Sequence, residues 1–243
     1  MTASEHWRLD GPRAFLSCGD LSAQVDIAHP GEGLQEIRLR GLALRGAQLL
    51  AARFAGDQQQ TQQVVADAFV RGRDLVVTYA QEPEHPVRVQ IYWRVVPEAK
   101  LCPGAVGVDL QVSVQTSLLH AWPALAICSY APTAWEVVTC GNNMGLLSSS
   151  AQGRAAACWR SSWPQTNATY FEMVHPADVE KEELAESAEG AFQLSHQLFA
   201  ESLEKGVILR ARARGIFTAE KLDAETVASV YERFLIAPLP LTT

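Results

Sequence analysis

The chain has 243 residues, of which 48% are hydrophobic, and its formal net charge is −7. This length suits one large domain, and the apolar share is enough for a substantial core, which excludes a wholly disordered chain. The acidic balance argues against a protein that binds nucleic acid over a broad basic surface.

Cysteine usage and the first residues bear on the cellular setting. The five cysteines are odd in number and contain no C-x-x-C pair, so they indicate neither a disulfide framework nor a zinc ribbon. The sequence begins without a basic segment followed by an apolar run, and it has no stretch of about 18 apolar residues. We therefore expect a single domain over residues 1–243, without a signal peptide or a membrane span, in the cytoplasm.

The N-terminal third predicts short strands joined by turns. Residues 14–28 form a strand pair broken at Cys18-Gly19-Asp20, and residues 34–44 return as another strand after a glycine-rich turn. Residues 47–63 are rich in glutamine, at 58–60 and 62–63, and we expect a mobile surface loop there that could act as a lid. Residues 64–79 predict two more short strands.

The clearest pattern lies in residues 87–116. Apolar residues occupy every second position at 87–95 and again at 106–114, with polar residues between most of them. Because successive side chains of a strand point to opposite faces, each arm has one apolar and one polar face. Two such arms predict a sheet that buries one side against a second layer.

The C-terminal half continues the pattern with less regularity. Residues 148–169 are expected to be irregular, and residues 176–187, which begin with proline and are rich in acids, predict a short exposed helix. Residues 191–200 and 206–217 predict a strand pair, and Asp223 can cap a final helix. The sequence therefore predicts an all-β fold, a large antiparallel two-layer β-sandwich with a few short helices.

The strand order at the start of the chain resembles that of galactose mutarotase-like proteins. Residues 21–27, the turn at Gly33, residues 34–41 and Leu49-Leu50 follow the family's order of strand, glycine turn, strand and sugar-contacting loop. The long segments at 87–116 and 191–217 also suit this aldose epimerase-type supersandwich. The resemblance implies a sugar or sugar-phosphate ligand and acid/base chemistry at the sugar ring. The family's Asn-His pair has no counterpart here, since Asn167 is followed by Ala168, so sugar binding is implied more directly than an isomerase activity.

The richest group of candidate site residues lies between positions 159 and 175. Aromatic faces stack on pyranose rings, whereas arginine, carboxylate and imidazole groups bond to hydroxyls. The alternative is that the tryptophans fill the ends of the sandwich and that His175 belongs to a simple turn. The proposed substrate-binding members are Trp159, Arg160, Trp163 and Tyr170. The proposed acid/base members are His175, His120 and Glu172, with Glu201 as an alternative carboxylate.

Three arginines also share one face of a predicted strand. Arg210, Arg212 and Arg214 are two residues apart, about 7 Å from one to the next, and could hold a uronate, a sugar phosphate or a sulfate. The alternative is a solvated face paired with acids such as Asp109. His196 lies among apolar residues, and we expect it to be a neutral core histidine.

Two classes of function remain open from the sequence. The first is a carbohydrate-binding protein with a small-molecule sugar as its partner. The second is a non-catalytic interaction module whose sheet face or edge pairs with another chain, which the apolar tail at 238–241 suggests. No spacing of histidines or carboxylates is typical of a metal site, so we expect no metal and no cofactor. Nucleic acid is not an expected partner, and the sequence does not set the oligomeric state.

Overall fold

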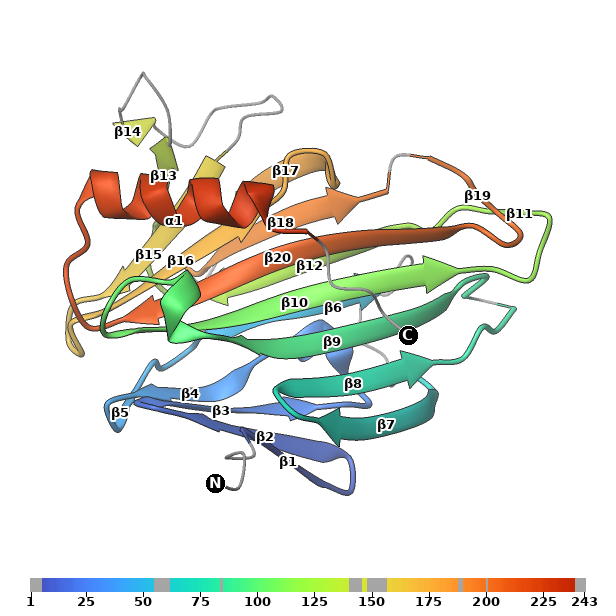
Figure 1. The fold of residues 1–243 in the computed structure, drawn as a ribbon, viewed down its shortest axis with the longest axis horizontal. Helices are drawn as coiled ribbons and strands as arrows, with labels where there is room; N and C mark the ends of the chain where they lie inside the picture. The colour runs from blue at the N-terminus through green and yellow to red at the C-terminus, as the bar shows by residue number, and fades with distance from the viewer. Residues whose placement is uncertain are drawn as a thin grey trace.

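The computed structural model describes residues 6–54, 62–83, 85–139, 146–147, 157–187, 190–199 and 201–238. In these ranges the chain forms antiparallel sheets, one α-helix and two short 3-10 turns, η1 (Pro30–Glu32) and η2 (Glu98–Lys100). This is the all-β sandwich that the sequence predicts (Figure 1).

The larger layer is a nine-stranded sheet with β10 near its centre. Its strands, in spatial order, are β14 (Leu146–Leu147), β13 (Trp135–Thr139), β15 (Ala157–Trp163), β16 (Ala168–Val174), β20 (Ile208–Thr218), β10 (Ala105–Gln115), β9 (Arg88–Val96), β8 (Asp74–Tyr79) and β7 (Val65–Arg71). The two predicted long arms are β9 and β10, which pair antiparallel as expected. Val108, Leu110 and Val112 of β10 are buried toward the interior of the sandwich, as their alternation predicts.

Three smaller sheets complete the sandwich. A four-stranded sheet has the order β17 (Val179–Glu186), β18 (Phe192–Leu198), β12 (Leu125–Ala131) and β6 (Gln48–Phe54). A five-stranded sheet contains β1 (Trp7–Asp10), β2 (Arg13–Cys18), β3 (Leu21–Asp26), β4 (Gln35–Leu39) and β5 (Leu42–Ala43). At one end, β11 (His120–Ala121) pairs with β19 (Leu203–Glu204). One continuous core joins all the larger sheets, with Val25 of β3, Val112 of β10 and Ile127 of β12 among its members.

The helix α1 (Ala224–Ile236) lies across the outer face of the nine-stranded sheet (Figure 1). Its apolar face forms a second core, in which Val230 and Phe234 pack with Phe171 and Ile216. The side chain of Asp223 accepts a hydrogen bond of 2.7 Å from the backbone N–H of Thr226, so the predicted N-cap is confirmed.

Two predicted irregular segments contain strands. Gln48–Phe54 forms β6 and not a loop, because its apolar run at 49–52 is buried against the core. The rest of that predicted loop, up to residue 61, lies outside the described residues. Ala157–Trp163 forms β15, whereas residues 148–156 also lie outside them.

Two sequence-based predictions were wrong, one of a helix and one of a strand pair. Val179–Glu186 is a strand, β17, at the edge of the four-stranded sheet, where charged residues face solvent just as they would on an exposed helix. The strands within 191–200 and 206–217 do not pair with each other. Instead β18 pairs with β17 and β12, and β20 pairs with β16 and β10.

Candidate functional site

A pocket lies beside β20, where its neighbouring strand stops. The pairing of β16 with β20 ends at Val174 opposite Ala213, although β20 continues to Ile208 along β10. The chain then turns away through residues 175–178 and enters β17. The carboxylate of Asp178 accepts a hydrogen bond of 3.2 Å from the backbone N–H of Arg212, in place of a further strand contact. The early part of β20 therefore has an open edge within the described chain.

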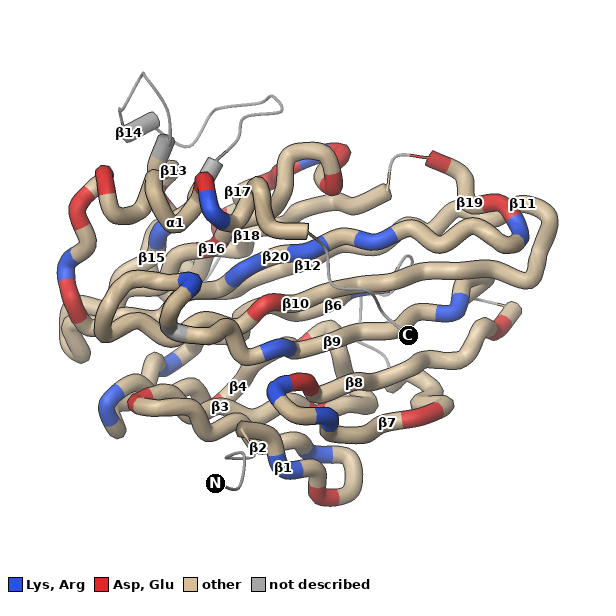
Figure 2. Tube along the Cα trace, viewed as in Figure 1, with Lys and Arg blue, Asp and Glu red and all other residues tan. Residues whose placement is uncertain are grey.

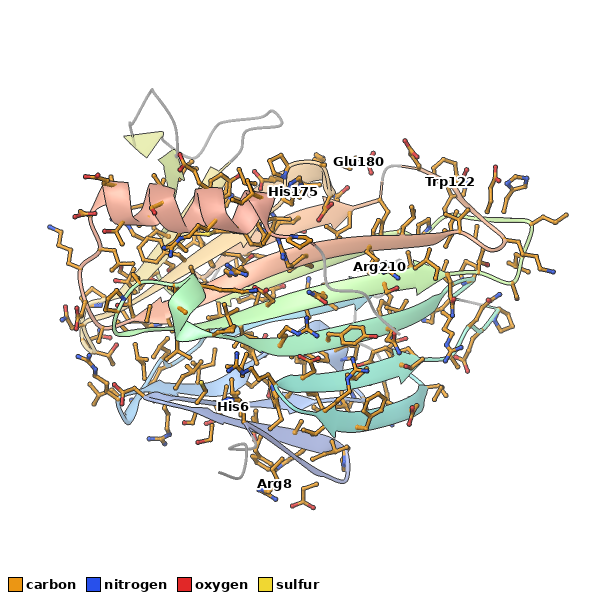
Figure 3. The ribbon with its side chains drawn as sticks, viewed as in Figure 1. His6, Arg8, Trp122, His175, Glu180 and Arg210 are labelled. Carbon is orange, nitrogen blue, oxygen red and sulfur yellow. The ribbon has the colours of Figure 1, made fainter. Side chains whose placement is uncertain are left out.

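The pocket fills the space beside this edge. It has a volume of about 250 Å³ and combines three carboxylates and one guanidinium with apolar walls. The lining residues are Ala177, Asp178, Val179, Glu180, Phe199, Glu201, Leu209 and Arg210. Glu180 and Glu201 are exposed, whereas Asp178 and Arg210 are half-buried. Figure 3 labels Glu180 and Arg210, with His175 near Glu180.

Burial and nearby charges act in opposite directions on Asp178. Burial raises the pKa of its carboxyl group, whereas the Arg212 N–H and the charges of His175 and Arg212 lower that pKa, and burial prevails. The carboxyl group therefore holds its proton to a higher pH than a free aspartic acid does.

The three arginines of β20 share a face, as predicted, and Figure 2 shows them as basic positions along the strand. Arg214 forms a bidentate pair with Asp109, with Nε and Nη2 donating over 2.7 and 3.0 Å. The predicted acid partner is thus confirmed, but the face is not solvated, because Phe234 of α1 lies over both Arg212 and Arg214.

Arg212 is held by the end of α1. Its Nη2 donates to the carbonyl oxygens of Phe234 and Ala237 over 2.7 and 3.3 Å, and burial lowers the pKa of its guanidinium. This leaves Arg210 as the arginine that lines the pocket. The buried Nε atoms of Arg210 and Arg212 have no hydrogen-bond partner among the residues that the structure describes.

The other predicted residues between positions 159 and 172 do not line a cavity together. Trp159, Trp163 and Tyr170 face the interior of the sandwich and belong to its core, which matches the alternative interpretation of the tryptophans. Arg160 points to the opposite face, where its Nε donates to Glu136 over 3.0 Å. The physical reason is alternation, because Trp159 and Trp163 lie an even number of residues apart on one strand.

Glu172 belongs to a buried polar network that bridges the two layers. Its Oε1 lies 3.0 Å from Nε2 of His196, and its Oε2 accepts hydrogen bonds from Ser129 and Tyr170 over 2.5 and 2.6 Å. The Nδ1 atom of His196 lies 2.9 Å from Glu182 of the neighbouring strand. Glu172 and His196 are fully buried, so a ligand cannot reach them without opening the core.

His196 is charged at neutral pH, contrary to the expectation of a neutral core histidine. Burial lowers its pKa, but the hydrogen bonds and charges of Glu172 and Glu182 outweigh burial and raise the pKa to about 9. The sequence around His196 could not predict this pKa, because Glu172 is contributed by a strand of the opposite layer.

The two remaining candidate histidines lie in different places. His175 is half-buried in the turn before the pocket, where its Nδ1 accepts the backbone N–H of Ala177 over 3.2 Å. His120 is exposed on β11 opposite Glu204, at the end of the sandwich. The structure thus brings His175, Arg210 and Arg212 together near the pocket and leaves His120 apart.

The described residues show neither a metal-binding cluster nor a membrane-spanning helix. Within those ranges, no three or more His, Cys, Asp or Glu side chains gather closely enough to hold a metal ion. None of the helices found there has the length and the hydropathy needed to cross a membrane.

Comparison with known proteins identifies the fold. No family model and no curated protein matches the sequence. A TPR-domain containing protein from Parabacteroides distasonis superposes with a TM-score of 0.59 at 8% identity, covering 88% of this chain and 48% of the other, so this chain spans about half of that protein. The Slr1438 protein from Synechocystis gives a TM-score of 0.55 at 8% identity, covering 87% of this chain and 97% of the other. A candidate mutarotase, YeaD, from Salmonella typhimurium gives 0.47 at 9% identity, covering 85% and 90%. The chain therefore shares the sandwich fold of the first two proteins, at identities that show the fold alone.

Proposed function

We propose that the protein binds a carbohydrate in the pocket beside β20. The observation that carries this proposal is Arg210, which lines a small cavity with three carboxylates and whose buried Nε has no partner in the described part of the chain. Pockets for drug-sized ligands usually measure about 300–1,000 Å³. A cavity of about 250 Å³ suits a ligand the size of one sugar ring.

The lining offers what a pyranose needs. Carboxylates accept hydrogen bonds from sugar hydroxyls, and a guanidinium donates to hydroxyl or ring oxygens. Phe199 and Leu209 provide apolar surface for the C–H face of the ring. The proposal also agrees with the resemblance of the first strands to galactose mutarotase-like proteins.

Asp178 is the pocket residue best suited to acid/base work. Its pKa is raised by burial, and His175 lies in the same turn. A raised pKa makes a carboxyl group a better match for proton transfer to and from a ring oxygen, as ring-opening chemistry requires. We therefore propose Asp178 and His175 as the acid/base groups of any turnover on the bound sugar, in place of Glu172 and His120.

An NMR titration with backbone assignments tests the binding proposal. The panel contains hexoses, hexosamines, uronates and hexose phosphates. We expect at least one sugar to shift signals of residues 177–180 and 209–210. Because a hydrogen bond to a charged group contributes about 1.5–3 kcal/mol, Arg210→Gln should weaken binding by roughly 10- to 150-fold.

Arg13→Gln is the matched control, because Arg13 is exposed on β2, outside the pocket. It should leave the affinity unchanged, and both variants should unfold at the wild-type temperature. The proposal fails if no sugar shifts the pocket signals, or if a sugar binds Arg210→Gln as tightly as it binds the wild-type protein.

A further inference from the structure

The pocket beside β20 and a second, smaller hollow share a row of residues at one end of the four-stranded sheet. Val179, Leu198, Leu125 and Phe54 lie side by side across β17, β18, β12 and β6. Val179 lines the pocket beside β20, whereas Phe54 and Leu125 line the second hollow. Adjacent strands are about 4.8 Å apart, so two spacings separate Val179 from Leu125 and three separate it from Phe54, about 10–14 Å across the sheet. Both hollows are therefore lined by residues at one end of the four-stranded sheet.

The second hollow is shallow and has a tryptophan on its wall. Its volume is about 30 Å³, too small for a ligand of its own, and Trp122 lines it together with Tyr79 and Pro86. Trp122 is 67% exposed. The other five tryptophans are at most 6% exposed, namely Trp7, Trp93, Trp135, Trp159 and Trp163. Since tryptophan is usually largely buried, an exposed indole beside a hollow indicates a contact surface.

The pair β11–β19 connects these two places. Glu201 of the first pocket precedes β19 by two residues, and Trp122 follows β11 directly. Between them, exposed His120 lies opposite exposed Glu204, while Leu203 is fully buried and anchors the pair to the core. Polar groups capable of bonding to hydroxyls therefore lie between an aromatic surface and a sugar-sized pocket. Figure 3 shows Trp122 at this end of the molecule, beyond Glu180 and Arg210.

We infer that the carbohydrate is an oligosaccharide, whose terminal ring enters the pocket beside β20 while later rings cross β11–β19 and stack on Trp122. This inference rests on the proposed carbohydrate function and adds the length of the ligand. Sugar rings present C–H faces that pack on an indole, and their outward hydroxyls suit His120 and Glu204. An extended chain uses both hollows, which a single sugar cannot do.

The test is a chain-length series measured by isothermal titration calorimetry. The probes are the malto-, cello- and galacto-oligosaccharides from monosaccharide to tetrasaccharide. In the wild-type protein, we expect affinity in at least one series to rise roughly two- to tenfold once a ring reaches Trp122. Trp122→Ala should abolish this rise and leave the monosaccharide affinity unchanged.

Two further variants separate stacking from general loss of apolar surface. Trp122→Phe keeps an aromatic face and should retain part of the rise. Leu119→Ala removes another exposed apolar side chain near β11, 77% exposed, and should leave the rise intact.

Monosaccharide binding without any gain for longer chains would overturn the inference and leave the proposed function standing, as would a gain that survives in Trp122→Ala. Failure of every sugar to bind would instead overturn the proposed function itself. A wild-type dimer that Trp122→Ala dissociates would assign the surface to protein contact and also overturn the inference.

Discussion

His196 should make the stability of the protein fall as pH rises from about 6.5 to about 9. Its pKa is about 9 in the folded protein, whereas a free histidine has its ordinary pKa of 6.5. A group whose pKa is raised by folding stabilises the folded state fully below its unfolded pKa, and this contribution is lost as pH passes through the folded pKa. A difference of about 2.5 units at about 1.4 kcal/mol per unit gives about 3 kcal/mol. The side chain is fully buried, so solvent does not screen its ion pairs.

Urea unfolding of the wild-type protein and of His196→Gln, at pH values from about 6 to about 10, measures this contribution. The informative quantity is the difference in unfolding free energy between the two proteins. Burial also raises the pKa of Tyr79, Tyr170 and Cys128, so both proteins lose stability at alkaline pH for reasons unrelated to His196. The difference removes these shared effects.

We expect the advantage of the wild-type protein to shrink by about 3 kcal/mol across this range, with a slope near 1.4 kcal/mol per pH unit in the middle. Glu172 and Glu182 bond directly to the imidazole, and Tyr170 and Ser129 bond to Glu172. An advantage that stays constant or grows with pH would refute the reasoning, because it would mean that His196 is neutral and that a carboxylate carries the proton.

Two further predictions concern the buried ion pair and a glycine turn. Asp109→Asn leaves the Arg214 guanidinium buried without its counter-ion and should lower the free energy of unfolding in urea by about 3–5 kcal/mol. Asp109→Leu combined with Arg214→Met should lower it far less, because no buried charge is left unpaired. An equal or larger loss in the double variant would contradict this account. Gly33→Ala should destabilise the protein more than Gly11→Ala does. Both glycines have a positive φ, but a Cβ at Gly33 would lie 2.4 Å from the carbonyl oxygen of Leu49, and one at Gly11 would meet nothing within 4 Å. Equal shifts in thermal unfolding for the two variants would show that the close contact at Gly33 relaxes freely.

The parts of the fold that the sequence predicts are those that depend on local pattern. Strict alternation over 106–114 fixes which face of β10 packs into the interior of the sandwich, although the polar face is buried as well. The cap at Asp223 likewise depends on residues within one helical turn. The prediction of a helix at residues 179–186 was wrong because acids are favoured both in the first turn of a helix and on an exposed edge strand. A bulge between Val179 and Lys181 also breaks the alternation.

The candidate site depends instead on which strands become neighbours. The pocket exists because β16 stops at Val174 while β20 continues to Ile208, a mismatch that appears only when the two strands are paired. The burial of the tryptophans at 159 and 163 is equally non-local, since composition does not distinguish an aromatic side chain in a core from one that stacks on a ligand. Arg210 was recognised from the sequence as one of three equivalent arginines, and only their different partners separate it from Arg214.

The position of β20 also constrains how the polypeptide reaches this state during synthesis. β20 pairs with β10 on one side and with β16 on the other, yet it leaves the ribosome after all the other described strands of the sheet. Until it emerges, the nascent chain carries two long strands whose facing edges have no partner, and such edges invite association with other chains. Truncation before residue 208 should therefore leave the facing edges of β10 and β16 unpaired and favour aggregation of the shortened chain.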